Sequence, residues 1–63
     1  MHTEMVHITG TVKSVTAKAV LLESDGVEGW IPLSLIKEGP DIYDEGDEVD
    51  VVIPEWKAEE YWG

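Results

Sequence analysis

The sequence contains no cysteine, no phenylalanine and no arginine. Without cysteine, neither a disulfide nor a zinc–thiolate site can stabilise the chain. Without arginine, its positive charge rests on four lysines against 14 acidic residues, so the formal net charge is −10. A field of that sign repels phosphate and slows association with nucleic acid. These absences leave a compact closed sheet or a partner chain as the source of stability.

The chain is also short. Its 63 residues amount to about half a typical domain, which excludes two domains and any large enclosed pocket. A hydrophobic fraction of 43% is ordinary for a globular protein and argues against global disorder. No window approaches the roughly 18 apolar residues of a membrane span. The first residues lack the pattern of a secretory signal, so we expect a cytoplasmic protein.

The charge is unevenly distributed along the chain. Residues 1–31 hold four acids and two lysines, a net charge of −2, whereas residues 32–63 hold ten acids and two lysines, a net charge of −8. The acidic half favours solubility, basic partners or mimicry of a polyanion. A merely solvating surface is the alternative.

Apolar residues near the N-terminus alternate with polar ones, as in a half-buried strand. Val6, Ile8 and Val12 lie at period two within residues 4–15, which predicts a strand over that range. Gly10 continues the same series and lacks a side chain. It predicts a bulge or a sharp bend, as small barrels need where a long strand turns a corner.

Three further strands follow from similar patterns, over residues 19–23, 27–31 and 48–53. Asp25-Gly26 separates the first two of these and is typical of a tight hairpin, because glycine tolerates positive φ. Pro32 ends the next strand, since proline has no N–H to donate. Residues 33–36 are too few for a full helix and predict a single helical turn. Serial antiparallel strands with little helix indicate a small barrel.

The segment after Ile53 combines aromatic and charged residues. Its apolar positions are spaced roughly as in a helix, so residues 55–63 predict a short amphipathic turn. We take residues 1–54 as the barrel and residues 55–63 as a tail that packs on it or is disordered. The aromatic residues of the tail either close the barrel or dock on a partner, since aromatic side chains are enriched at interface hot spots. They are Trp56, Tyr61 and Trp62.

Several segments together resemble the S1 branch of the OB-fold. They are Gly10-Thr11-Val12, Ala19 to Leu22, Glu28-Gly29-Trp30-Ile31-Pro32-Leu33-Ser34 and Tyr43-x-x-Gly46-Asp47-x-Val49. The resemblance spans roughly residues 6–53. It implies an all-β chain, a small S1-like OB-fold barrel of four to five strands with one short helical turn. Short segments around Lys18, Trp30 and Pro54 are also similar to small uncharacterised proteins of bacteriophages and mobile elements.

Three residues of the matched segments have clear physical roles. Gly29 is expected to let the third strand approach its neighbour closely. Ser34 is well placed to cap the turn after the third strand. Gly46 is expected to supply the bend that starts the fourth strand.

S1 modules generally bind single-stranded RNA or DNA with a basic groove and stacking aromatic rings. Here the family's two stacking positions fall on Lys18 and Leu21, and its histidine position falls on Pro32, so no ring stands at any of them. Trp30 shares strand parity with Pro32 and is the remaining candidate for stacking, unless it packs against the tail. Lys13 and Lys18 lie in the less acidic half and either contact phosphate or are simply solvated.

Other chemistry finds little support in the sequence. If Asp41 is taken as position one of an EF-hand loop, position twelve is Val52, where a glutamate is required. A serine–histidine pair would have to recruit His2 or His7, and no serine lies in a nucleophile-elbow context. There is no phosphate-binding glycine loop. We therefore expect no metal site, no cofactor and no catalysis.

We expect Ile42 and Tyr43 to anchor the acidic loop.

Two functions from different classes remain. The first is weak, salt-sensitive binding of single-stranded nucleic acid. Its candidate contacts are Lys13, Lys18, Leu21 and Trp30. The second is an acidic accessory factor of phage type that binds a basic protein or mimics nucleic acid. Its candidate partner contacts are Trp56, Tyr61 and Trp62. A barrel left open by a missing fifth strand could also pair with a second copy of the chain.

Overall fold

The computed structural model describes residues 3–63. Its elements are β1 (Met5–Val15), β2 (Ala19–Ser24), β3 (Val27–Pro32), the 3₁₀ turn η1 (Leu33–Leu35), β4 (Glu48–Pro54) and α1 (Glu55–Trp62). All four predicted strands are confirmed, and each boundary lies within one residue of the expected position. The predicted helical turn is confirmed as η1.

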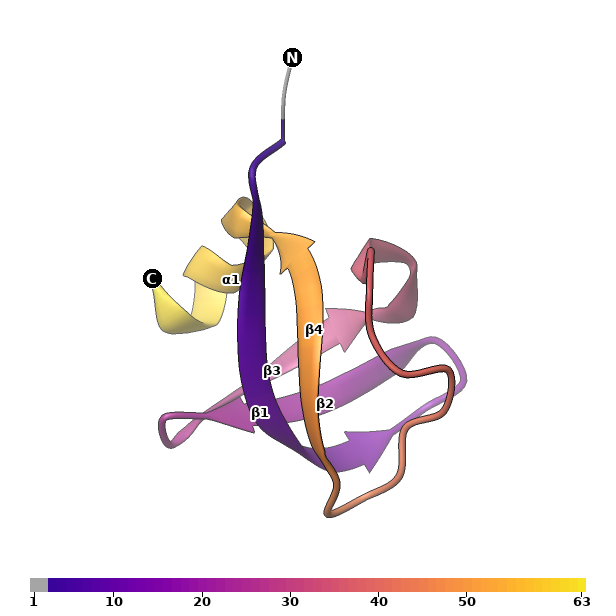
Figure 1. The fold of residues 1–63 in the computed structure, drawn as a ribbon. Helices are drawn as coiled ribbons and strands as arrows, with labels where there is room; N and C mark the ends of the chain where they lie inside the picture. The colour runs from indigo at the N-terminus through magenta and orange to yellow at the C-terminus, as the bar shows by residue number, and fades with distance from the viewer. Residues whose placement is uncertain (1–2) are drawn as a thin grey trace.

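The four strands form one antiparallel sheet in the order β3-β2-β1-β4 (Figure 1). β1 serves two partners in succession. Its first part pairs with β4, from Met5 to Thr11, and its last part pairs with β2, from Thr11 to Val15. The described strand pairs leave β3 and β4 as the two edges, so the sheet is open and the expected barrel is not confirmed.

β1 curves near Thr11, where its pairing changes from β4 to β2 (Figure 1). Gly10 lies at this crossing, and a Cβ added there would lie 2.6 Å from the carbonyl oxygen of Glu23. A bulge follows between Val12 and Ser14, with Lys13 as the extra residue. The expectation of a bulge or bend at Gly10 is therefore confirmed as a close crossing with a bulge three residues later.

Two turns depend on left-handed backbone conformations. Asp25 and Gly26 have φ angles of 53° and 80°, which is the pattern of a two-residue hairpin of type I′. Gly46 has a φ of 91°, and its N–H donates to the carbonyl oxygen of Val12 over 2.8 Å. The predicted hairpin and the predicted bend before β4 are both confirmed.

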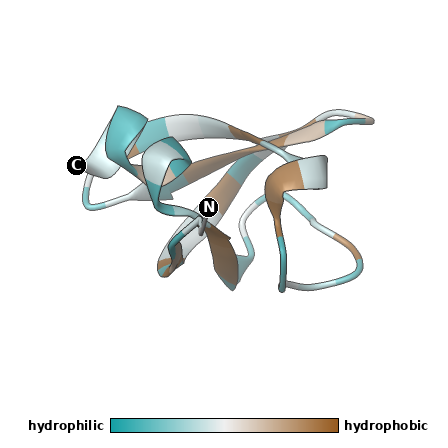
Figure 2. Cartoon of the chain, turned by 90° about the horizontal axis from the view of Figure 1, so that it is seen from above, coloured by the Kyte–Doolittle hydropathy of each residue, from teal (hydrophilic) through white to brown (hydrophobic). Residues whose placement is uncertain are grey.

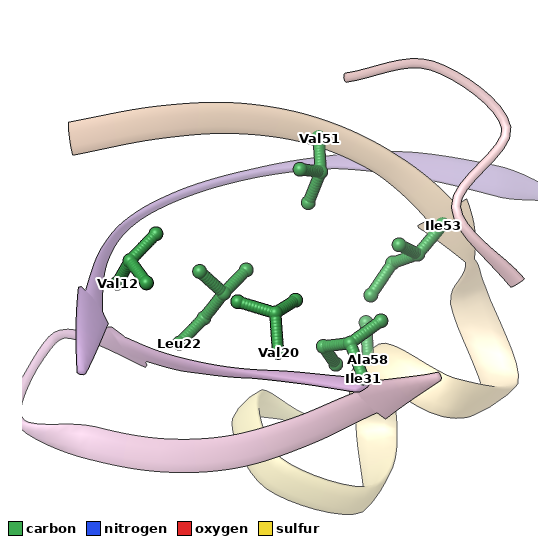
Figure 3. Packing of buried hydrophobic residues seen from close by; sticks show 7 residues of the cluster. All are labelled: Val12, Val20, Leu22, Ile31, Val51, Ile53 and Ala58. Carbon is green, nitrogen blue, oxygen red and sulfur yellow. The ribbon is translucent and has the colours of Figure 1, made fainter. Parts of the chain in front are cut away.

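The core lies inside the curve of the sheet (Figure 3). Strands β1 and β4 contribute from one side and β2 and β3 from the other. α1 adds Ala58, which is 6% exposed. The buried cluster is Val12, Val20, Leu22, Ile31, Val51, Ile53 and Ala58. The fully enclosed core is therefore aliphatic, and Tyr43, Tyr61 and Trp62 pack against it from outside.

The C-terminal tail is a helix packed on the sheet. α1 begins directly after Pro54, which ends β4, and the N–H of Glu55 donates to the carbonyl oxygen of Glu4 over 2.8 Å. α1 contacts β1, β3 and β4. The loop between η1 and β4 lies at the opposite end of the molecule (Figures 1 and 2).

The first residues of the loop are hydrogen-bonded to β4. Backbone bonds of 2.8 Å join Lys37 N–H to the carbonyl oxygen of Val52, and Val52 N–H to the carbonyl oxygen of Glu38. Tyr43 packs against the core, as expected. Ile42 is 74% exposed, so the prediction that it anchors the loop is wrong.

The turn after β3 also differs from expectation in one detail. Pro32 is the N-cap residue of η1, and no side chain forms a capping hydrogen bond there. Ser34 lies inside the turn and is exposed. The prediction that Ser34 caps this turn is therefore wrong, because it lies two residues after the cap position.

Candidate nucleic-acid interface

The outer face of β2 and β3 carries a row of cross-strand pairs. The strand register places Leu21 opposite Trp30 and Glu23 opposite Glu28. Side chains alternate along a strand, and the intervening side chains of Val20, Leu22 and Ile31 are buried in the core. The outer face therefore presents an apolar pair followed by an acidic pair.

Trp30 is the most prominent side chain of this face. It is 41% exposed, whereas Leu21 opposite it is half-buried. Aromatic and aliphatic side chains that face each other across strands stabilise a sheet. The exposed part of the indole is a flat surface of the kind on which a base stacks.

Lys13, the bulge residue of β1, reaches the same face. Its Nζ lies 3.8 Å from Oε1 of Glu23, on the strand that also carries Leu21. The two side chains are 43% and 37% exposed. An ion pair this open to water contributes about 1 kcal/mol at most, so Lys13 can exchange Glu23 for another anion at little cost.

Lys18 lies at the other end of the face, in the tight turn before β2. Thr16 Oγ1 accepts a hydrogen bond of 3.0 Å from the N–H of Ala19. The carbonyl oxygen of Lys18 accepts one of 2.8 Å from the N–H of Leu33, which joins this turn to the end of β3. The Lys18 side chain is exposed. The structure thus brings Lys13, Leu21 and Trp30 onto one face and sets Lys18 at its margin.

The charges on this face nearly balance. Lys13 and, at the margin, Lys18 stand against Glu23, Glu28 and the hairpin residue Asp25, a local charge of −1, whereas the whole chain carries −10. Like charges directly opposite each other destabilise a strand pair, and Lys13 offsets part of that repulsion. The face is therefore close to neutral, but it is not the basic groove of a strong nucleic-acid binder.

The three aromatic residues of the tail have different surroundings. Trp56 is 51% exposed on the first turn of α1. Tyr61 Oη donates to the carbonyl oxygen of Trp30 over 3.2 Å. Trp62 Nε1 donates to the carbonyl oxygen of Val27 over 3.1 Å. Only Trp56 keeps half of its surface free, while the other two bind the backbone of β3.

Gly29 accommodates one of these rings. A Cβ added to Gly29 would lie 2.5 Å from Cγ of Tyr61 and 2.9 Å from its Cε2. We expected Gly29 to allow a close approach between two strands. The close contact is instead with the Tyr61 ring of α1. Sequence reasoning missed this contact, because nothing in the local pattern links a strand glycine to a tyrosine in the tail.

A shallow hollow of about 340 Å³ lies beyond the end of β3, between η1 and the loop. Its lining includes Leu33, Lys37, Asp41 and Tyr43. Burial raises the pKa of Tyr43 above its ordinary value. Sequence reasoning did not identify this hollow, since its walls come from an irregular loop.

The histidine, acidic and serine side chains are the groups that could bind a metal or take part in catalysis. Within residues 3–63, no group of three or more histidine, cysteine, aspartate or glutamate side chains could hold a metal ion. His7 Nδ1 lies 3.6 Å from Oδ1 of Asp50, and both side chains are largely exposed. Ser24 Oγ donates to the carbonyl oxygen of Thr9 over 2.8 Å. His2 lies outside the described residues.

No helix in the described part of the chain is long and apolar enough to cross a membrane.

Comparison with known proteins gave one match. A family model described as "S1 RNA binding domain" matches residues 4–60. Searches of curated proteins and of solved structures found no match. The resemblance to phage and mobile-element proteins gains no support from these comparisons.

Proposed function

The chain belongs to the S1 RNA-binding domain family, and from that premise we propose that the outer face of β2 and β3 binds single-stranded RNA. Membership implies RNA binding in general and an OB-fold. The observation that carries the choice of face is the position of Trp30. It is the one aromatic residue in a described strand, and it lies on the outer surface with 41% of its side chain exposed.

The residues of this face have separate roles in the proposal. One base stacks on Trp30, and Leu21 supports the ring from the opposite strand. Lys13 exchanges Glu23 for a phosphate, and Lys18 meets a second phosphate at the margin. With two lysines the salt dependence is shallow, because each phosphate contact on a single strand contributes a slope of about −0.7. The net charge of −10 opposes approach and keeps binding weak.

We propose a binding module rather than an enzyme, without a metal or cofactor. Catalytic carboxylates work in clefts that perturb their pKa values. The acids of the outer face, Glu23 and Glu28, lie on an open strand surface instead. A cytoplasmic location remains our prediction.

The test compares two exposed tryptophans. Binding of a fluorescently labelled single-stranded RNA is measured by anisotropy at low salt for the wild type, W30A and W56A. Loss of one base–ring stack costs about 1–3 kcal/mol, so W30A should weaken binding by roughly fivefold or more. W56A should bind as the wild type does. Equal binding by the wild type and W30A would refute this face as the site.

A second candidate function rests on Trp56. This side chain is 51% exposed and lies on a helix that also carries Glu55, Glu59 and Glu60. Residues 32–63 hold ten acids and two lysines, a net charge of −8. We propose as the alternative that this acidic half docks on a basic protein, with Trp56 as the anchor.

A pull-down from host lysate at rising salt tests the alternative. Recovery of a basic protein that high salt and W56A both abolish supports it. An empty pull-down at low salt refutes it. The sequence also left open a homodimer through an open barrel edge. At the edge of β3, such pairing would require α1 to leave the strand, since Tyr61 binds the carbonyl oxygen of Trp30 there.

A further inference from the structure

One side of β3 pairs with β2, and no strand pairs with its other side in the described sheet. Side chains of α1 donate hydrogen bonds to β3. An unpaired strand edge presents backbone groups that need partners. Tyr61 and Trp62 of α1 each donate one hydrogen bond to a carbonyl oxygen of β3. The Trp30 carbonyl faces the open edge, so the Tyr61 O–H supplies a hydrogen bond that a further strand would otherwise donate, whereas Trp62 binds a carbonyl beside the hairpin turn.

The two contacts meet β3 at different places. Trp62 binds the carbonyl oxygen of Val27, beside the hairpin turn. Tyr61 binds the carbonyl oxygen of Trp30 itself, and its ring fills the space left by Gly29, the preceding residue. Tyr61 therefore holds the peptide unit that carries Trp30 through both a hydrogen bond and a close packing contact.

We propose that Tyr61 is a positioning residue for ligand binding, which sets the orientation of Trp30 from the opposite side of β3. The proposal rests on the function proposed above. The carbonyl group of Trp30 and its side chain share one α-carbon, so fixing the peptide limits the directions in which the indole can project. A ring that is already oriented loses less freedom when a base stacks on it, and this raises affinity.

The variant Y61F removes only the hydroxyl group and keeps the ring over Gly29. The matched control is W62F, which removes the other hydrogen bond from α1 to the same strand. Since W62F also loses part of a large ring, it loosens α1 at least as much as Y61F does. A difference between the two variants then reports on the bond to Trp30 and not on general loosening of the helix.

Anisotropy titrations with single-stranded RNA at low salt compare the wild type, Y61F and W62F. We expect Y61F to weaken binding by about twofold to tenfold, the range of one neutral hydrogen bond, and W62F to stay within about twofold. In the free protein, the amide ¹⁵N shift of Ile31, which follows the Trp30 carbonyl, should change in Y61F and not in W62F. This spectrum also shows that each variant is folded.

The possible outcomes separate the two proposals. If the wild type binds and Y61F binds equally well, the positioning role is wrong while the binding function stands. If both variants weaken binding alike, α1 acts only as general support and the specific role of Tyr61 is refuted. If the wild type does not bind single-stranded RNA at all, the proposed function fails and the positioning role fails with it.

Discussion

At the scale of single residues, the contact between Gly29 and Tyr61 ties the core to the candidate site. The glycine allows the tyrosine ring to lie against β3, and the ring's hydroxyl reaches the carbonyl oxygen of Trp30. A residue that faces the interior thus controls the backbone of a residue that faces the solvent. Any side chain at position 29 would have to displace the ring.

We expect G29A to destabilise the protein by about 1–3 kcal/mol, the usual cost of overpacking. The methyl group would overlap the Tyr61 ring. Urea denaturation followed by circular dichroism measures the loss in free energy of unfolding. The control repeats the substitution in a Y61A background, where the clash is absent and the cost of G29A should shrink by at least about 0.5 kcal/mol. An equal cost in both backgrounds would show that the ring is not the obstacle.

Some of these residue roles could be predicted from the sequence, and others could not. Strand parity with Pro32, together with the S1 resemblance, placed Trp30 on the binding face, and the resemblance alone indicated Leu21. The bond between Tyr61 and Trp30 joins residues 31 positions apart, and no periodicity reports such a contact. Ile42 was expected to anchor the loop because it is apolar, yet its neighbour Tyr43 reaches the core instead.

At the scale of elements, α1 takes over part of the role of a strand. Period-two alternation predicted β1 and β4 to within one residue, because it follows directly from burial of one face. The apolar run before Asp25-Gly26 and the hairpin signal itself predicted β2 and β3 equally closely. The apolar spacing of the tail indicated a helical segment. It could not indicate where that segment packs, because docking depends on the edge that the open sheet leaves uncovered.

We expect A58E to detach α1 and to lower the free energy of unfolding by about 2 kcal/mol or more, since it forces a charge into the core. Ala58 is 6% exposed. The freed edge of β3 should then pair between chains, which sedimentation velocity would detect as concentration-dependent association. The control W56E adds the same charge at an exposed site of the same helix and should change stability by no more than about 0.5 kcal/mol. If A58E stays monomeric and as stable as W56E, α1 does not protect the edge.

At the scale of the whole molecule, the negative charge is concentrated in the second half of the chain. The outer face of β2 and β3 is nearly balanced, and most of the excess negative charge follows Pro32. For such a face on an acidic protein we expect weak RNA binding, through bases more than through phosphates. The sequence predicted this balance, because the location of charge along the chain is read directly. It could not predict that the sheet stays open, since closure depends on contacts between distant segments.

Binding of single-stranded RNA at the face around Trp30 can be observed directly by NMR, in a titration of the ¹⁵N-labelled full chain with a single-stranded RNA oligonucleotide at low salt. We expect shifts at the amides of Lys13, Lys18, Leu21 and Trp30 and at the Trp30 indole, while α1 residue Trp56 stays unchanged. Absence of any shift in these residues at millimolar RNA, or shifts confined to α1 and the acidic loop, would contradict binding at this face.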